Sequence, residues 1–412
     1  MAVSANPSSV ASSAVMMSAA VVASAIGLVF YNVLPLFLGT LQDSAGFAND
    51  QLGLIAAGLF LGFNLSGLSS YFWIKRVSPF LACGAAFAGM VALLLLSAFT
   101  SSFPPFLCVA VMIGLASGVL ASVAAAVIGR ATNANKWFGF KTAAESMVGV
   151  VLLFVLPATL IPRFGFSGVV FGVVILLVCL SPLIFWLSRK PLSDIVSQRG
   201  SREAGASFSA SDAGMKPSSF RAGRHAPAYW ALASMVAFFV GASSIWAFLD
   251  RIAVAHNFDA SAIGILIGVT LFCSVWAPLV AGAAPLRIGY FHPFLAGCAL
   301  LLIGTVEVTL SSNFALFAMG ACLYMLGWSG ALPFSYSMIV AADADGRHIA
   351  LAPFAFGVGS MIGPMVGGYL FVNGSTPPLL VLMILSLAVA IVAAWKSQAK
   401  AMSNPSRLDA EA

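Results

Sequence analysis

Long apolar blocks dominate this chain and restrict it to a small set of folds. Hydrophobic residues make up 61% of the 412 residues and charged residues only 8%, whereas ordinary soluble domains carry about 25% charged residues. The apolar residues gather in twelve blocks, each of about 20 residues, which is the length that a helix needs to cross a bilayer. Only helices and closed barrels satisfy their backbone in lipid, and blocks this long favour helices. The sequence therefore predicts an all-α integral membrane protein with twelve transmembrane helices.

The predicted helices form two groups of six on either side of one polar stretch. Their spans are 15–38, 51–73, 78–99, 105–128, 138–160 and 166–187, then 228–249, 260–283, 291–311, 314–339, 349–372 and 377–395. The stretch between the groups is rich in Ser, Gly and Arg and cannot bury enough apolar surface to order itself. We therefore expect an N-terminal half (1–188), a flexible linker (189–227), a C-terminal half (228–396) and a tail (397–412).

The distribution of basic residues predicts the orientation. The linker alone holds seven of the 19 Lys and Arg residues. If the N-terminus is cytoplasmic, 17 of the 19 face the cytoplasm, and only Arg163 and Arg251 lie outside. Cytoplasmic loops of membrane proteins carry such an excess. We expect a multi-pass protein of the plasma (inner) membrane with both termini and the linker in the cytoplasm. This orientation explains the positive charge without nucleic acid as a partner. Because no Lys or Arg precedes the first apolar block, we expect that block to be a retained transmembrane helix and not a signal peptide.

A short internal repeat relates the two halves. The segment Pro79–Ala82 recurs as Pro293–Ala296, each time at the start of the helix that follows a basic loop. Six predicted spans separate the copies, and because six is even, the two halves run in the same direction. Parallel six-helix halves joined by a long inside loop are typical of transporters that bind their solute between the halves, near the bilayer midplane.

With this plan the chain resembles the major facilitator superfamily of transporters, of the bacterial type, over essentially its whole length. Fragments of that superfamily's loop signature, GxxxDRxGRR, are present after the eighth helix, where Gly282, Arg287 and Gly289 stand in register and Leu286 occupies the Asp position. The segment Gly363–Gly368 is similar to the GPxxGG of the antiporter signature, but it lies on the eleventh helix instead of the fifth. These fragments identify no subfamily.

The resemblance places the solute site in a central cavity, and polar and aromatic side chains on the cavity helices are its candidates. They are Tyr31 and Asn32 on the first helix, Asn64 on the second, Trp246 at the matching place on the seventh, and Tyr324 and Trp328 on the tenth. The last two are four residues apart and so share a face. Aromatic residues at this spacing often serve packing alone. An aromatic-lined cavity with few charges favours a small, partly apolar organic solute.

Ionisable residues inside apolar blocks are the candidates for coupling and gating, because each is costly in lipid. Lys141 and Glu145 lie one turn apart on the fifth helix. Burial favours a protonated Glu145 and the nearby cation an ionised one, so Glu145 is either the proton-responsive group or half of an ion pair that braces the inside gate. Asp250 and Arg251 close the seventh helix at its outer end. They form either an outer gate or handhold for a charged solute, or a solvated helix terminus.

These patterns predict a proton-coupled secondary active transporter that works by alternating access. An efflux antiporter for drugs or metabolites is the alternative, and a non-transporting receptor or channel is the alternative from another class. No ATP-binding GxxxxGK[ST] motif and no catalytic constellation occurs, so neither an ATP-driven pump nor an enzyme is expected. The six cysteines lie within apolar blocks without metal-ligand spacing, and no cofactor or metal is expected. The expected partners are a small-molecule solute, the lipid bilayer and protons. The protein is expected to be a monomer.

Overall fold

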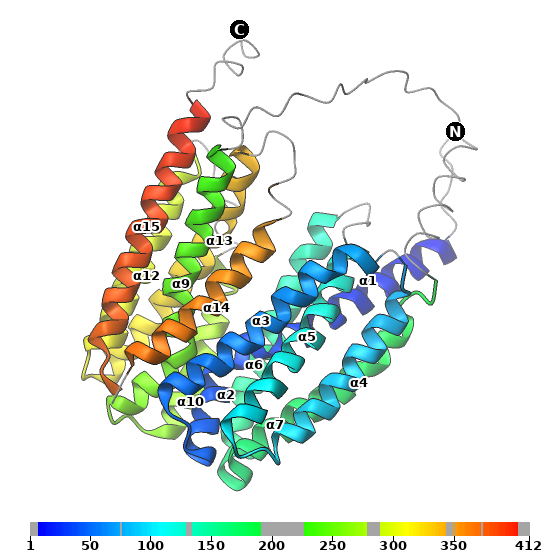
Figure 1. Ribbon diagram of the computed structural model, residues 1–412, viewed down its shortest axis with the longest axis horizontal. Coiled ribbons are helices and arrows are strands. Elements are labelled where there is room, and N and C mark those ends of the chain that lie inside the picture. Colours follow the sequence, from blue (N-terminus) through cyan, green and yellow to red (C-terminus); the bar gives the residue numbers. More distant parts are fainter. Residues whose placement is uncertain are drawn as a thin grey trace.

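The computed structural model describes residues 7–74, 76–128, 134–190, 226–277, 289–342, 348, 351–371 and 374–402. These residues are almost wholly helical and form two bundles that lie side by side (Figure 1). Ten helical stretches among them are long and apolar enough to cross a membrane. The predicted all-α membrane fold with two six-helix halves is confirmed.

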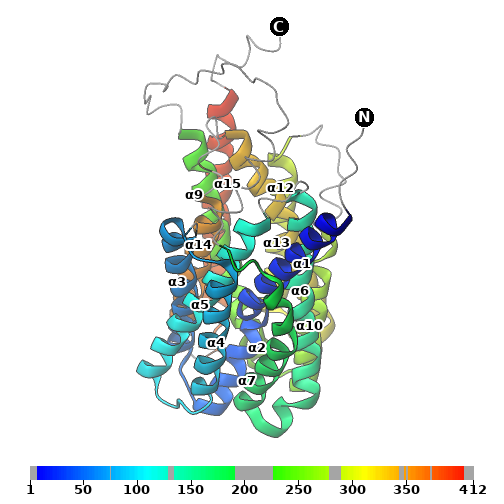
Figure 2. The same cartoon turned by 90° about the vertical axis from the view of Figure 1, so that its right-hand side faces the viewer.

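The helices of the N-terminal half follow the first six predicted spans. They are α1 (Pro7–Gly27), α2 (Val29–Ala45), α3 (Asn49–Trp73), α4 (Pro79–Ser97), α5 (Phe103–Ile128), α6 (Ala134–Thr159) and α7 (Ile161–Leu180), continued by the 3-10 helix η1 (Ser181–Trp186). The first span is interrupted at Leu28, and α1 runs obliquely whereas α2 follows the long axis of the bundle (Figure 2).

The helices of the C-terminal half follow the other six spans. They are α9 (Ala226–Ala255), α10 (Ala260–Cys273), α12 (Phe291–Leu310), α13 (Phe314–Ala342), α14 (Ala352–Leu370) and α15 (Pro377–Met402). The described chain stops at Ala277 before α12, so the end of the span predicted over 260–283 lies outside the described residues. The same holds for nearly all of the predicted linker.

Capping residues and glycines set several helix boundaries. Ser78 accepts a hydrogen bond from the Leu81 backbone N–H (3.2 Å), and Pro79 follows in the first helical position of α4, where its missing N–H costs nothing. Gly46 ends α2 with a left-handed φ of 69°. Gly289, from the predicted loop signature, takes φ 71° just before α12, whereas Gly282 and Arg287 lie outside the described residues.

In the described part of the chain, three pairs of helices make most of the contact between the halves: α3 with α14, α6 with α10, and α2 with α9. The α3–α14 pair depends on close backbone approach, since a Cβ on Gly53 would lie 3.1 Å from the Cα of Gly368. We call the end of the molecule that holds Ala226 and Met402 the linker side, and the opposite end, which holds the α2–α3 and α9–α10 connections, the far side. The bundles approach each other toward the far side and diverge toward the linker side (Figure 1).

Candidate functional site

Aromatic side chains from both halves surround Tyr31 where the bundles meet. The ring of Tyr31 on α2 lies 5.8 Å from that of Phe60, 6.0 Å from that of Trp328 and 5.2 Å from that of Phe356, centroid to centroid. Phe239 lies 4.6 Å from Phe356 and 5.6 Å from Trp328. Most of these contacts are edge-to-face, the arrangement that the charge distribution of aromatic rings prefers. We call Tyr31, Phe60, Phe239, Tyr324, Trp328 and Phe356 the aromatic cluster.

Two polar side chains of the aromatic cluster's surroundings have hydrogen-bond partners within the protein, and that of Tyr31 has none among the described residues. The hydroxyl of Tyr324 donates to the carbonyl oxygen of Ala242 (2.5 Å). The indole N–H of Trp246 donates to the backbone carbonyl oxygen of Tyr31 (2.9 Å). The hydroxyl of Tyr31 is buried and has no hydrogen-bond partner among the described residues. Because buried polar groups almost always have partners, this hydroxyl is suited to bind a ligand.

An apolar crevice adjoins Tyr31 on the side of the N-terminal half. In this state it holds about 20 Å³ of space that a water molecule can occupy, and its walls come from α1, α2, α3 and α5. Ser117 lines it from α5, is 4% exposed, and has a hydroxyl without a hydrogen-bond partner in the described part of the chain. The crevice thus combines apolar walls with the hydroxyl-bearing side chains of Tyr31 and Ser117.

The two predicted asparagines are buried and bonded within the N-terminal half. Asn32 donates from its side-chain amide to the backbone carbonyl oxygen of Glu145 (2.8 Å) and so joins α2 to α6. Asn64 donates to the carbonyl oxygen of Phe60 (2.8 Å), one turn earlier on α3. It also packs against α14, where a Cβ on Gly357 would lie 2.6 Å from the Asn64 Cγ. The Asn32 amide therefore joins two helices, whereas the Asn64 amide bonds within α3 and packs against α14.

The predicted Lys141–Glu145 pair is present and has a third member. The Lys141 ammonium lies 2.7 Å from Oε1 of Glu145, and the Ser24 hydroxyl on α1 donates to the same oxygen (2.5 Å). Glu145 is only 7% exposed. Because α6 begins at Ala134, Glu145 lies about 16 Å along its helix at 1.5 Å per residue. We call Ser24, Lys141 and Glu145 the carboxylate cluster.

One side chain of the C-terminal half connects the carboxylate cluster with the aromatic cluster. Tyr336 on α13 lies close enough to both Glu145 and Tyr31 to interact with them electrostatically. Its hydroxyl comes from the half opposite to that of Glu145. Glu145 therefore lies near a side chain of the other half.

Asp250 and Arg251 form an ion cluster that joins the halves on the far side. The Arg251 guanidinium contacts Asp250 (2.5 Å), Asp43 on α2 (2.5 Å) and the Gln42 side-chain oxygen (3.3 Å). Asp250 and Arg251 are each 8% exposed, whereas the Asp43 side chain is 63% exposed. The predicted pair is not a solvated terminus, since both residues are buried and α9 continues to Ala255. We call Asp43, Asp250 and Arg251 the far-side ion cluster.

Several of these residues carry no recognisable signal in the sequence. Asp43 follows the predicted first span, which ends at residue 38, but α2 continues to Ala45. Ser24 is one of many serines, and Phe60, Phe239 and Phe356 are three of 33 phenylalanines. Within the described ranges, no group of three or more His, Cys, Asp or Glu side chains is placed to hold a metal ion.

Comparison with known proteins agrees with this geometry. The family model described as Major Facilitator Superfamily matches residues 19–344, and no curated protein matches. Among solved structures, the nucleoside transporter NupG is 13% identical, with a TM-score of 0.66 over 93% of this chain and 98% of that one. The xylose transporter XylE from E. coli, in a partially occluded inward open conformation, is 14% identical, with a TM-score of 0.65 over 92% and 99%.

A structure of proton dependent oligopeptide transporters is 14% identical, with a TM-score of 0.68 over 94% of this chain and 98% of that one. At such low identity these likenesses show the shared fold. The family model spans most of the chain and confirms the resemblance that the sequence indicated. The protein belongs to the major facilitator superfamily and is a multi-pass membrane transporter rather than an enzyme.

Proposed function

We propose that this protein is a secondary active transporter that moves a small, partly apolar organic solute by alternating access. The observation that carries the proposal is the buried hydroxyl of Tyr31, which has no hydrogen-bond partner among the described residues and lies inside an aromatic cluster built by both halves. A solute bound there contacts both halves at once. Its binding energy can then depend on how the halves are tilted, which is what couples binding to a conformational change.

The chemistry of the walls favours one class of solute. The aromatic cluster and the crevice offer apolar surface and the hydroxyls of Tyr31 and Ser117, and neither contains a formal charge. Such a site suits a ring or short chain that carries one or two hydrogen-bonding groups. A multiply charged solute would lose its hydration there without a matching charge.

The state and orientation follow from the ion cluster together with the basic residues. The far-side ion cluster joins α2 to α9, and the positive-inside pattern supports an inner-membrane protein whose linker side faces the cytoplasm. In this assignment the structure is closed toward the outside. A reporter fused after Ala412 or inserted near Gly214 should be cytoplasmic, and one near Asn257 should be external. An external linker would reverse the assignment.

Glu145 is the residue proposed to couple solute movement to protons. It is a buried carboxylate that contacts an ammonium and a hydroxyl, and it interacts with Tyr336 of the other half. A change in its protonation alters the charge that faces the moving half. Uptake and efflux use the same geometry, so an efflux antiporter for drugs or metabolites is distinguished only by the direction of coupled flow.

The site is tested by substituting Tyr31. Purified protein is first screened with aromatic acids, sugars and amphipathic amines for compounds that raise its melting temperature, and hits are followed in vesicles with and without a pH gradient. Tyr31→Phe removes one hydroxyl and should weaken the apparent affinity for a hit about fivefold, the effect of one hydrogen bond. Tyr369→Phe, at an exposed position on α14, is the matched control. An unchanged affinity in Tyr31→Phe would exclude Tyr31 from the site.

A further inference from the structure

Pro35 in the middle of α2 changes the hydrogen bonding of the helix at one position. A proline has no backbone N–H, so it cannot donate to the carbonyl four residues earlier. In α2 that carbonyl belongs to Tyr31. A free backbone carbonyl inside a membrane protein is costly unless another donor reaches it.

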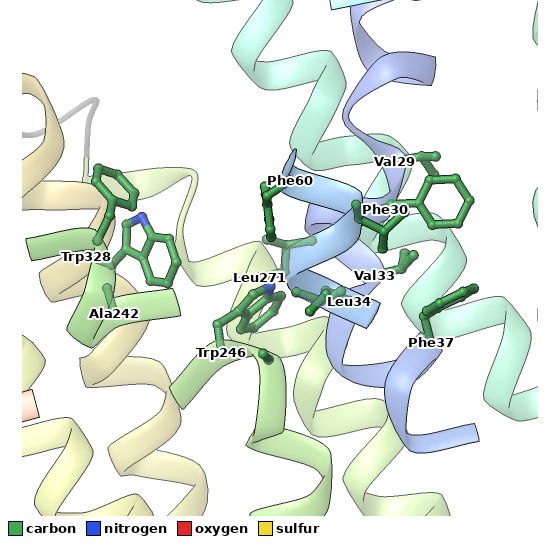
Figure 3. Close-up of a cluster of buried hydrophobic side chains, with 14 of the residues drawn as sticks. Val29, Phe30, Val33, Leu34, Phe37, Phe60, Ala242, Trp246, Leu271 and Trp328 are labelled. Carbon is green, nitrogen blue, oxygen red and sulfur yellow. The ribbon is translucent and has the colours of Figure 1, made fainter. Parts of the chain in front are cut away.

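The donor comes from the other half. Trp246 on α9 is 2% exposed, and its indole N–H lies 2.9 Å from the Tyr31 carbonyl oxygen. Its ring extends from α9 toward Leu34 of α2 (Figure 3). An indole N–H buried this deeply also needs a partner. The bond between Trp246 and Tyr31 therefore satisfies one unpaired group from each half.

We propose that Pro35 and Trp246 form an inter-half latch that positions Tyr31 and holds the far side closed. The inference rests on the proposed alternating access. Because the bond joins α2 to α9, it must break when the halves separate on the far side. Breaking it leaves a carbonyl and an N–H unpaired until water enters, which favours the state seen here. Because the acceptor is the backbone of Tyr31, the latch also fixes the residue whose hydroxyl is free for the solute.

A simpler role for Pro35 would be to bend α2 without regard to Trp246. The two roles differ in how the substitutions combine. Pro35→Ala restores an N–H that competes for the Tyr31 carbonyl, so in a latch its effect depends on Trp246. A bend alone predicts the same effect of Pro35→Ala whether or not the indole N–H is present.

The experiment measures the far-side opening directly, without a solute. All six cysteines are free, and they are first replaced by alanine. Spin labels are then attached through Ala48→Cys and Ala255→Cys. Both positions are exposed; Ala48 ends the α2–α3 turn and Ala255 ends α9. Trp246→Phe keeps an aromatic ring but removes the donor, and should raise the ratio of open to closed distances about fivefold. Pro35→Ala should shift the ratio in the same direction, and Pro35→Ala combined with Trp246→Phe should match Trp246→Phe alone.

Matched controls separate the latch from general damage. Trp395→Phe, at an exposed position on α15, and Pro333→Ala, in α13, should leave the distances unchanged. Additive shifts in the double variant, or an unchanged ratio in Trp246→Phe, would overturn the latch. If Arg251→Gln opens the far side but Trp246→Phe does not, the latch is wrong and alternating access stands. If no variant produces an open state, alternating access itself fails.

Discussion

Two ion clusters in the described part of the chain differ in which helices they join. The far-side ion cluster connects Asp43 on α2 with Asp250 and Arg251 on α9, and so joins the two halves. The carboxylate cluster connects Lys141 and Glu145 on α6 with Ser24 on α1, all within the N-terminal half. Only the first must break when the halves separate. The second lies within one half and can stay intact through a conformational cycle, as the proposed coupling role of Glu145 requires.

The far-side ion cluster also requires a glycine for its geometry. A Cβ on Gly39 of α2 would lie 2.7 Å from Cγ of Asp250 and 3.0 Å from Nη2 of Arg251. With glycine there, α2 approaches α9 closely enough for Asp43 to reach the guanidinium. The carboxylate cluster needs no such approach, because Lys141 and Glu145 are neighbours on one helix face.

The largest expected effect comes from removing the cation that joins the halves. Arg251→Gln leaves Asp250 buried without its partner, and breaking a buried pair in this way costs about 3–5 kcal/mol. We expect a lower melting temperature and a far side that is mostly open by the spin-label distances.

Two further variants make this result interpretable. Arg163→Gln removes an exposed cation from the same side and should change neither measurement. Asp250→Asn added to Arg251→Gln removes the orphaned charge, and most of the lost thermal stability should return. A far side that stays closed in Arg251→Gln would mean that the cluster does not hold the halves together.

A smaller and different effect is expected in the carboxylate cluster. Glu145→Gln keeps an oxygen that can accept from Lys141 and Ser24 but cannot carry an exchangeable proton. Because the ion pair and the hydrogen bond of this cluster lie within the N-terminal half, solute exchange across reconstituted vesicles should persist, while accumulation driven by a pH gradient should disappear. The loss of the charge beside the half-buried Lys141 ammonium should cost about 1 kcal/mol of stability.

The matched control for this variant is Glu307→Gln on α12, which lies outside the cluster. It should accumulate solute like the unsubstituted protein. Glu145→Gln that still concentrates its solute under a pH gradient would remove Glu145 from the coupling mechanism. Loss of both exchange and accumulation would instead indicate that the cluster braces the structure.

The difference between the clusters also shows which contacts can be predicted from the sequence. Lys141 and Glu145 are four residues apart, so helical geometry alone predicts their contact. Asp43 and Arg251 are 208 residues apart, and their contact depends on the packing of two halves that no local pattern encodes. The predicted first span ends at residue 38 because polar residues follow, yet α2 continues through them to Ala45. Apolar blocks predicted which helices exist, but not where their polar ends lie.

The aromatic cluster was predicted only in part for a related reason. Tyr31, Tyr324 and Trp328 stand out because Tyr and Trp are uncommon near the bilayer midplane. Phe60, Phe239 and Phe356 complete the cluster, but phenylalanine is abundant throughout the apolar blocks. Pro35 is visible in the sequence as a helix-bending residue. That its freed carbonyl meets Trp246 follows only from the approach of α2 to α9.

The smallest expected effect separates the two carboxylates that share Arg251. The Asp43 side chain is 63% exposed, and exposed ion pairs contribute less than about 1 kcal/mol because water and salt screen them. Asp43→Asn should therefore raise the ratio of open to closed spin-label distances by less than about fivefold, and the ratio should lose its dependence on salt concentration.

Asp50→Asn, in the first turn of α3 on the same side, should retain the salt dependence of the unsubstituted protein. Since Asp250 stays paired with Arg251 in Asp43→Asn, the melting temperature should change little. If Asp43→Asn opened the far side as fully as Arg251→Gln, the exposed bridge rather than the buried pair would hold the halves together.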